Sequence, residues 1–411
     1  MNKIIIQGGK PLRGEITVSG SKNAALPIIF SCILTRGVSK IENIPDIGDV
    51  RVALEILSDF GARITREGNF VTINTEKLAY VMPKSELVSE IRASTYLIGA
   101  CLSRFGICHI QPFGGCSFAH RPIDMHLAAC RALGADFFDN ELRADQLLGG
   151  RIIFDKPSVG ATVNAILLSV CAEGDSHIAG CAVEPHIDSL IDFLNSCGAS
   201  INRQGRDIYV SGRRLHGGQI RIIGDMIEAG SYLASGIITN GEVSVLDCPI
   251  EDMSATISVF RSLGAEITIH QSSISASMRG QGRFFRINST PYPGFPTDLQ
   301  PIFAPLMAKF SGGEITDNVW TTRFGYFNSL ANFGIEAKTL GNTATVQRSA
   351  IHNGKATAPD LRGAFACLLA ALSADGTSEI YSPEIILRGY ENLETKLRAL
   401  GAMITINQDE I

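Results

Sequence analysis

The stretch LSDFGARI, residues 57–64, carries a leucine-containing helix end through a Gly-Ala pair into the start of a strand. Glycine accepts the left-handed backbone that ends many helices, so the stretch predicts a helix stop followed by a strand. Related stretches recur along the chain: CRALGADF (130–137), LNSCGASI (194–201), FRSLGAEI (260–267), LANFGIEA (330–337) and LRALGAMI (397–404). Their glycines lie 64 to 73 residues apart, which indicates an internal repeat of nearly constant period.

Each repeat also begins in a similar way. An apolar segment, interpreted as a helix, ends near a glycine where a left-handed C-cap is expected, and a strand follows. These glycines are Gly37, Gly106, Gly174, Gly241, Gly313 and Gly376. A loop, a second helix and one or two alternating strands complete a unit of roughly βαβαββ. Six such units predict an α/β protein of two domains, with three units each and a join near GGQIRIIGDM (217–226).

The composition limits the class of protein. Of the 411 residues 45% are hydrophobic and 19% charged, as in a soluble globular protein, and the net charge of −5 disfavours a general binder of nucleic acid or anionic membrane. No apolar run approaches the ~20 residues of a membrane span. We expect a cytoplasmic protein, because the cysteine pattern favours reduced thiols. The ten cysteines include no CxxC pair, and Cys32, Cys101, Cys171 and Cys367 lie in apolar surroundings, which favours reduced, buried thiols over disulfides or zinc ligands.

Polar and charged residues gather at two equivalent places in the units. The starts of the first helices carry Lys22, Asn23, Arg92, Lys156, Ser158, Asp298, Asp360 and Arg362, and the loops before the second helices carry Cys116, Arg121, Arg323 and Arg388. Singly, each has an ordinary explanation, such as a helix cap at Asp298, a satisfied histidine at His126 or a surface ion pair. Their common register favours a cleft between the domains that binds a strongly negative ligand.

Cys116 lies in PFGGCSFAHRPIDMH, residues 112–126. A free cysteine is most often buried and inert. Here Gly114 and Gly115 supply backbone freedom and Arg121 supplies positive charge, which favours a reactive thiol. The sequence leaves both interpretations open, with the reactive one preferred.

Several motifs in one order resemble the UDP-N-acetylglucosamine enolpyruvyl transferases over essentially the whole chain. They are SGSKNAALP (19–27), GGC with RPIDMH (114–126), DKPSVGAT (155–162), FPTDLQ (295–300), DLRGAFA (360–366) and RGYENLETKLRALGA (388–402). The resemblance implies a two-domain inside-out α/β barrel with three βαβαββ units per domain, as in enolpyruvylshikimate-phosphate synthase. It also implies that residues 1–21 pair with the second domain, that the first domain spans 22–222, and that the second spans 223–411.

The resemblance implies a reaction as well. Phosphoenolpyruvate would give its enolpyruvyl group to the 3-hydroxyl of UDP-N-acetylglucosamine and release phosphate, the first committed step of peptidoglycan synthesis. No metal or organic cofactor, no nucleic acid and no membrane would take part, and the epoxide fosfomycin would alkylate Cys116.

The same resemblance assigns roles to residues. The catalytic set would be Cys116 as proton donor, Asp298 as base, and Lys22 and Arg388 on the phosphate. Arg121 would also contact the phosphate, and Arg323 and Arg362 the carboxylate of phosphoenolpyruvate. The nucleotide sugar would contact Asn23, Arg92, Arg121, Pro122, Ile123, Asp124, Met125, His126, Lys156, Pro157, Ser158, Val159, Asp298 and Val319.

The chain departs from the family's usual pattern at several positions, including Tyr96, where a tryptophan is customary, and the stretch SFAH at residues 117–120. Gly48 and Met226 stand where a lysine and an arginine are usual, and Leu387 stands where an acidic residue is frequent. Two fewer cations keep an alternative open, an enolpyruvyl transferase that acts on another nucleotide, such as UMP, in secondary metabolism. A non-catalytic binding protein of the same fold is a third hypothesis, disfavoured because Cys116, Lys22, Asp298 and Arg388 are all present.

Overall fold

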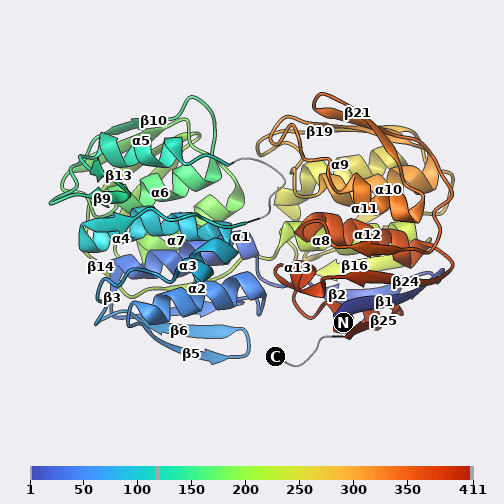
Figure 1. Ribbon diagram of the computed structural model, residues 1–411, viewed down its shortest axis with the longest axis horizontal. Coiled ribbons are helices and arrows are strands. Elements are labelled where there is room, and N and C mark those ends of the chain that lie inside the picture. Colours follow the sequence, from blue (N-terminus) through green and yellow to red (C-terminus); the bar gives the residue numbers. More distant parts are fainter. Residues whose placement is uncertain (1, 116–120, 408–411) are drawn as a thin grey trace. The chain divides into compact units, whose positions relative to one another are not determined.

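One sheet pattern is repeated along the chain in the computed structural model, which describes residues 2–115 and 121–407 (Figure 1). In five four-stranded sheets an outer strand runs parallel to its neighbour, and the remaining two pairings are antiparallel. The described residues divide into two units. The inserted unit comprises residues 20–115 and 121–223, and the split unit comprises residues 2–19 and 224–407.

The inserted unit contains three repeats. Its helices are α1 (Lys22–Ser31), η1 (Cys32–Leu34), α2 (Gly48–Asp59), α3 (Ser85–Glu90), η2 (Arg92–Tyr96), α4 (Leu97–Phe105), α5 (Asp124–Ala132), α6 (Val159–Ser169) and α7 (Pro185–Ser196). One sheet has the order β15–β4–β6–β5 (Gln219–Arg221, Val38–Glu42, Phe70–Asn74, Arg63–Glu67). A second has the order β10–β11–β13–β12 (Arg151–Ile153, Asp175–Ala179, Asp207–Ser211, Ser200–Gln204). Two smaller sheets are β7–β9–β8 (Ile107–His109, Glu141–Arg143, Asp136–Phe138) and β14–β3 (Leu215–His216, Thr35–Arg36).

The split unit also contains three repeats. Its helices are α8 (Met226–Ile238), η3 (Ile250–Met253), α9 (Ser254–Leu263), α10 (Gln300–Phe310), α11 (Phe327–Leu330), η4 (Ala331–Phe333), α12 (Leu361–Ser373), α13 (Pro383–Leu387) and α14 (Leu393–Ala399). One sheet has the order β2–β16–β18–β17 (Arg13–Thr17, Glu242–Leu246, Ser273–Ser277, Glu266–Ile269), and another β19–β20–β22–β21 (Phe285–Ser289, Gly313–Asp317, Thr343–Val346, Ala337–Leu340). The last has the order β23–β24–β1–β25 (Lys355–Thr357, Gly376–Tyr381, Lys3–Gly8, Met403–Asn407).

Two strands from the start of the chain complete sheets of the split unit. Strand β1 pairs antiparallel with both β24 and β25, in the place that a hairpin strand occupies in the other sheets. Strand β2 pairs parallel with β16 and supplies the outer strand of another sheet. In Figure 1 the blue strand β1 lies beside the red strands β24 and β25.

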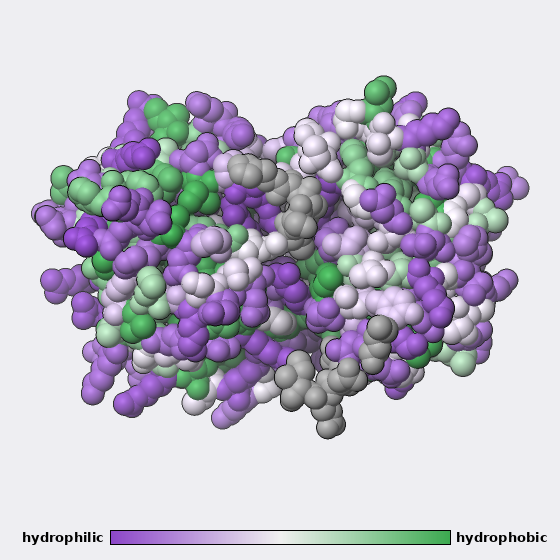
Figure 2. All heavy atoms as spheres, in the orientation of Figure 1, coloured by the Kyte–Doolittle hydropathy of each residue, from purple (hydrophilic) through white to green (hydrophobic). Residues whose placement is uncertain are grey.

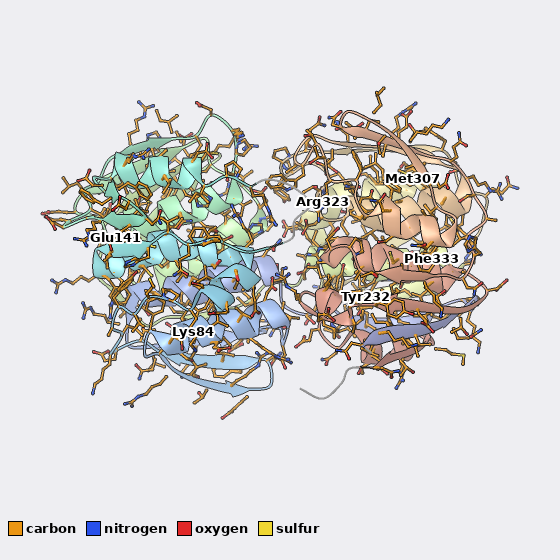
Figure 3. The ribbon with its side chains drawn as sticks, viewed as in Figure 1. Lys84, Glu141, Tyr232, Met307, Arg323 and Phe333 are labelled. Carbon is orange, nitrogen blue, oxygen red and sulfur yellow. The ribbon has the colours of Figure 1, made fainter. Side chains whose placement is uncertain are left out.

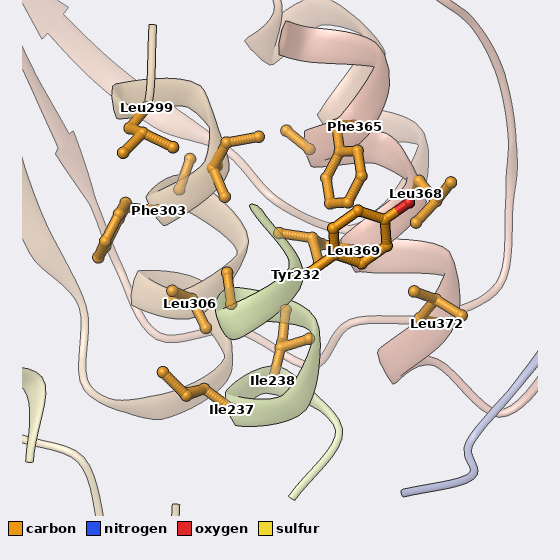
Figure 4. Packing of buried hydrophobic residues seen from close by; sticks show 14 of the residues in the cluster. Tyr232, Ile237, Ile238, Leu299, Phe303, Leu306, Phe365, Leu368, Leu369 and Leu372 are labelled. Carbon is orange, nitrogen blue, oxygen red and sulfur yellow. The ribbon is translucent and has the colours of Figure 1, made fainter. Parts of the chain in front are cut away.

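The core of the split unit is built by α8, α10 and α12, which pack against one another (Figure 4). All thirteen residues of α12 are buried, from Leu361 to Ser373. A helix that is covered on every side belongs in the interior, with the sheets outside it. Tyr232 and Ile238 of α8, Phe303 of α10, and Phe365 and Leu369 of α12 are side chains of this core.

The fold class predicted from sequence is confirmed at the level of a mixed α/β protein with repeated units, but the closed barrel is not observed. Among the described residues the strands of each unit form separate sheets, and none closes on itself. Hydrophilic side chains cover much of the visible face of each unit (Figure 2). No helix in the described ranges has the length and apolar character needed to cross a bilayer.

The repeat glycines explain where helices end. All six signature glycines, from Gly61 to Gly401, have φ between 79° and 104°. The second set of predicted glycines is only partly right. Gly37, Gly106, Gly174 and Gly376 have positive φ, whereas Asn240 and Gly312, one residue earlier, adopt it in place of Gly241 and Gly313. Of that set Gly106 alone is the left-handed cap of a described helix, because the others lie in or next to the following strands.

Candidate functional site

Asp298 lies between two buried arginines of the split unit. Arg323 donates from Nη1 to Asp298 Oδ1 at 2.8 Å, and Arg362 donates from Nε to Asp298 Oδ2 at 3.3 Å. Arg323 and Arg362 are only 3% and 1% exposed, while the Asp298 side chain is 33% exposed. The carboxylate therefore keeps an accessible face while both oxygens are held by guanidinium groups. Figure 3 labels Arg323 in this unit.

The start of α12 positions Arg362. Asp360 caps the helix and accepts from the backbone N–H groups of Arg362 and Gly363 at 3.0 and 3.2 Å. The Arg362 guanidinium lies over the ring of Tyr390, 5.3 Å from its centroid. Its buried Nη1 has no hydrogen-bond partner among the described residues. A buried guanidinium nitrogen in this state suits an anionic ligand, since leaving it unpaired costs free energy.

Hydrogen bonds between side chains and the backbone fix the position of Arg323 and the end of β20, the strand that precedes it. Gln300, the first residue of α10, donates to the Arg323 carbonyl at 2.9 Å and accepts from the Tyr326 hydroxyl at 2.6 Å. Asp317, fully buried at the end of β20, accepts from the Thr297 hydroxyl at 2.6 Å. The same carboxylate accepts from the backbone N–H groups of Val319 and Trp320, both at 2.9 Å. These bonds fix the loop that runs from Val319 to Arg323.

The electrostatics of Arg323 follow from this arrangement. Burial alone would lower the pKa of its guanidinium, but the carboxylates of Asp298 and Asp360 raise it above the ordinary value. Arg323 therefore remains a cation, and it donates through Nη1 to the Thr297 carbonyl at 3.2 Å as well.

In the inserted unit, Lys22 is the first residue of α1 and forms an ion pair with Asp49 of α2. The Lys22 Nζ and Asp49 Oδ2 atoms are 3.0 Å apart, and the two side chains are only 15% and 6% exposed. Asn23 follows Lys22 in the first turn of the same helix and is half-buried. The first turn of α1 thus presents a cation and an amide together.

Arg92 and Arg121 lie close together, although 29 residues separate them. Arg92 donates from Nη2 to the carbonyl oxygen of Arg121 at 2.6 Å. Burial, and then the charge of Arg121, lower the pKa of Arg92. Gly115 lies against both: a Cβ built there would be 2.7 Å from Arg92 Cβ and 2.8 Å from Arg121 Nη2. Two neighbouring arginines favour the binding of an anion.

The stretch that follows Arg121 and the stretch that leads into Val159 come together at the start of α6. Ser158 caps α6 and accepts from the Ala161 N–H at 3.4 Å. His126, in the first turn of α5, is 5% exposed and lies against Gly160. Pro122, Ile123, Asp124, Met125, Lys156, Pro157 and Val159 lie beside these residues along the chain, and each is half-buried or exposed.

The structure therefore brings the predicted residues together in two sets, one per unit. Asp298, Val319, Arg323 and Arg362 belong to the split unit; Lys22, Asn23, Arg92, Arg121 and the α5 and α6 starts belong to the inserted unit. Arg388 caps the C-terminal end of α13 and is half-buried. Cys116 lies outside the described residues. Asp298 is not the helix cap considered from sequence, because α10 begins at Gln300 with Leu299 as its cap.

Sequence reasoning missed the partners that hold these groups. Asp49, Asp317 and Gln300 are buried polar residues that contact predicted site residues. Asn164 is another, and its signal was available: it is the one amide in α6, whose other residues are apolar except for Thr162 and Ser169. Three positions that depart from the family pattern lie at element ends, with Gly48 and Met226 first in α2 and α8 and Leu387 last in α13.

A metal site is not observed in the part of the chain that the structure describes. No group of three or more His, Cys, Asp or Glu side chains there could hold a metal ion.

Comparison with known proteins gives three consistent similarities. A family model described as EPSP synthase (3-phosphoshikimate 1-carboxyvinyltransferase) matches residues 6–397. A UDP-N-acetylglucosamine 1-carboxyvinyltransferase 3 of Caldanaerobacter subterraneus subsp. tengcongensis is 38% identical, covering 98% of this chain and 99% of that protein. A UDP-N-acetylglucosamine 1-carboxyvinyltransferase of Halothermothrix orenii is also 38% identical, with the same coverage.

Solved structures show the same fold. The enolpyruvyl transferase NikO from Streptomyces tendae superposes with a TM-score of 0.90 at 23% identity, covering 100% of this chain and 99% of that one. EPSP synthase from Acinetobacter baumannii superposes with a TM-score of 0.72 at 18% identity, covering 99% and 100%.

Proposed function

Because the chain belongs to the enolpyruvyl transferase family, we propose that it transfers the enolpyruvyl group of phosphoenolpyruvate to the 3-hydroxyl of UDP-N-acetylglucosamine and releases phosphate. The observation that carries this proposal is the similarity along the whole chain, at 38% identity, to two enzymes named for that transfer. The proposal places the protein in peptidoglycan synthesis in the cytoplasm. The same relationship supports interpreting each unit as three βαβαββ repeats of the family's inside-out barrel.

The reaction makes specific demands on side chains. The sugar hydroxyl loses a proton as its oxygen bonds to C2 of phosphoenolpyruvate, and C3 gains a proton. When the C–O bond to phosphate breaks, C3 loses a proton again and the double bond returns. A base for the hydroxyl, an acid for C3 and cations for the phosphate and carboxylate are therefore needed.

Asp298 is our candidate for the base. Its carboxylate keeps an accessible face, and the two arginines that hold it fix its position. Arg362 Nη1, buried and without a hydrogen-bond partner among the described residues, is available to the carboxylate of phosphoenolpyruvate, and Arg323 lies beside it. The proton acceptor and the arginines that bind the phosphoenolpyruvate carboxylate would then act from one rigid cluster.

The inserted unit supports the remaining assignments. We assign phosphate contacts to Lys22 and Arg121, together with Arg388 of the split unit, and nucleotide contacts to Arg92 and the first turn of α6. The Arg92–Arg121 pair and the N-terminus of α6 favour anionic oxygens. Cys116 is our candidate for the acid at C3, on the basis of its motif.

The acceptor is tested by phosphate release from phosphoenolpyruvate with UDP-N-acetylglucosamine, UMP or shikimate 3-phosphate. We expect turnover with the UDP-sugar. Gly48 and Met226 replace two usual cations, and they favour a smaller nucleotide as the second candidate. Turnover with UMP and none with the UDP-sugar would replace the first function by the second.

A further inference from the structure

The amide of Asn164 is wedged between two backbone groups that fix its orientation. Its Oδ1 accepts from the N–H of Gly99 at 2.6 Å, and its Nδ2 donates to the carbonyl of Thr95 at 3.0 Å. A backbone N–H can only donate and a carbonyl can only accept, so the oxygen and nitrogen of this amide cannot exchange places. Asn164 is fully buried in α6 and lies so close to Gly99 that a Cβ added there would be 2.7 Å from its Oδ1.

The fixed amide determines the protonation of a second buried side chain. Asn164 Nδ2 lies 2.7 Å from His126 Nδ1 and is a donor, so His126 Nδ1 must accept. In a neutral imidazole the proton is then on Nε2. Burial lowers the pKa of His126 to about 4, and the charge of Arg92 acts in the same direction. The ring is therefore uncharged at neutral pH.

Among the described residues, Arg92 and Asp124 are the charged groups that act on the ring. Arg92 of η2 lowers the pKa of His126, and Asp124 of its own helix raises it. Helix α6, which packs against α5, turns the uncharged Gly160 and Asn164 toward the ring. A change at Asn164 therefore alters the dominant polar contact of His126.

No hydrogen bond joins His126 Nε2 to another described residue, and although the residue is only 5% exposed, this nitrogen is not among the fully buried atoms that lack a partner. It lies over the first turn of α6: a Cβ built at Gly160 would be 3.1 Å from Nε2 and 2.9 Å from Cε1. The first N–H groups of an eleven-residue helix point out at the same place and favour a negative charge. The Nε2–H and the helix start thus converge on one position.

We propose that Asn164 is a positioning residue that holds His126 with its proton on Nε2, so that this N–H donates to an anionic oxygen of the bound nucleotide at the first turn of α6. The proposal rests on the nucleotide-sugar acceptor proposed above. An uncharged donor of fixed tautomer gives a nucleotide affinity that does not change with pH across the neutral range.

The tautomer is measured without substrate, by the ¹⁵N shifts of the histidine ring nitrogens. His126 is one of eight histidines, and its signals are those missing in His126→Gln. We expect a proton on Nε2 and no titration between pH 5.5 and 8.5. A proton on Nδ1, or titration of the wild-type ring in that range, overturns the proposal whatever the enzyme's substrate is.

Asn164→Asp tests the positioning role. A carboxylate accepts but cannot donate, so it draws a proton onto His126 Nδ1 and raises the pKa of the ring. In this variant we expect the His126 ring to be protonated on both nitrogens near pH 6. Near pH 8.5 we expect the proton on Nδ1 alone, so that Nε2 cannot donate. We expect the dissociation constant for UDP-N-acetylglucosamine, measured by calorimetry, to rise about tenfold between these pH values, while the wild-type value stays flat. A flat profile in the variant contradicts the proposal.

A matched pair of variants tests the donor itself. In His126→Gln the side-chain amide nitrogen can take the place of Nε2 and donate from there. In His126→Asn the shorter side chain brings its amide only as far as the place of Nδ1. We expect UDP affinity within about threefold of wild type for the first and about tenfold weaker for the second. Uridine affinity, which involves no phosphate, is expected to be unaffected; an equal loss for uridine overturns the anion assignment. If the wild type binds no UDP compound, the proposed function fails while the tautomer result stands.

Discussion

At the scale of single residues, Asp298 shows how buried cations prepare a carboxylate for chemistry. Its two oxygens each accept from a different guanidinium, and the remaining solvent-accessible face is where a hydroxyl could approach. The sequence predicted Asp298, Arg323 and Arg362 as site residues because they lie at equivalent ends of the repeat units and in motifs that resemble those of the family. It could not predict that they contact one another, because 25 and 64 residues separate Asp298 from its partners.

Replacing Asp298 by asparagine tests its role as base. The amide keeps the size of the side chain but cannot take a proton, so we expect kcat to fall about 10³-fold with the fold retained. Phosphate release and a thermal melt measure the two effects. The control is Glu314→Gln, which removes a carboxylate from the exposed ion pair with Arg286 and is expected to leave kcat unchanged. An Asp298→Asn enzyme with near wild-type kcat would remove Asp298 from the mechanism.

Selective alkylation tests Cys116. Of the nine described cysteines eight are buried and Cys171 is half-buried, and burial raises the pKa of Cys130 and Cys197 to about 12. We expect limited treatment with iodoacetamide or fosfomycin at pH 7 to modify Cys116 first, as read by peptide mass spectrometry. Cys116→Asp should retain activity and Cys116→Ser should lose nearly all of it. Full activity of the serine variant would show that the thiol is dispensable.

At the scale of elements, the signature glycines explain why the repeat could be found in the sequence. A left-handed residue is needed after each second helix, and all six positions use glycine for it. The position of the left-handed residue at the start of each repeat is harder to predict, because in two repeats it is Asn240 or Gly312, one residue before the expected glycine. Asparagine tolerates this conformation too, so the pattern of glycines alone cannot give the position.

Helix α6 offers a test in which helix propensity and site geometry act in opposite directions. Alanine favours a helix over glycine by up to ~1 kcal/mol, but the Cβ of Gly160→Ala would lie 2.9 Å from His126 Cε1. The buried ring has to move, so we expect stability close to wild type with KM for the UDP-sugar about tenfold higher and kcat retained. Steady-state kinetics and a melt measure this. Gly280→Ala, where nothing lies within 4 Å of the added Cβ, should change neither.

At the scale of the whole molecule, a buried ion pair ties together distant parts of the split unit. Lys396 of α14 donates to Glu228 of α8 at 2.6 Å and to the Ser19 hydroxyl at 2.6 Å. Glu228 also accepts from the Ser19 backbone N–H at 2.8 Å. The end of β2, α8 and α14 thus meet at one carboxylate, a contact between residues up to 377 positions apart that no local pattern reveals.

The pH dependence of unfolding tests this carboxylate. Burial raises the pKa of Glu228 above its ordinary value of 4.5, although Lys396 lowers it again in part. Between 4.5 and the higher folded value the folded chain binds more protons, so Glu228 makes stability fall as pH rises through that window. Glu228→Gln should remove this fall. Urea unfolding, followed by the fluorescence of Trp320, the single tryptophan and a residue of the split unit, measures both slopes. Parallel profiles for the two proteins would contradict the assignment.

The strands contributed by the start of the chain have a consequence for how the protein is made. Residues 3–17 are translated before their partners in β16, β24 and β25, which follow more than 200 residues later. At roughly 5–20 residues per second, β2 waits about 10 to 45 seconds for β16, and β1 waits longer for β24. Once residue 221 has been translated the inserted unit has all of its strands, whereas β1, with the sequence KIIIQG, still has none of its neighbours. Until β24 and β25 have been translated, the backbone hydrogen-bonding groups of β1 therefore lack the partners that they have in the folded sheet.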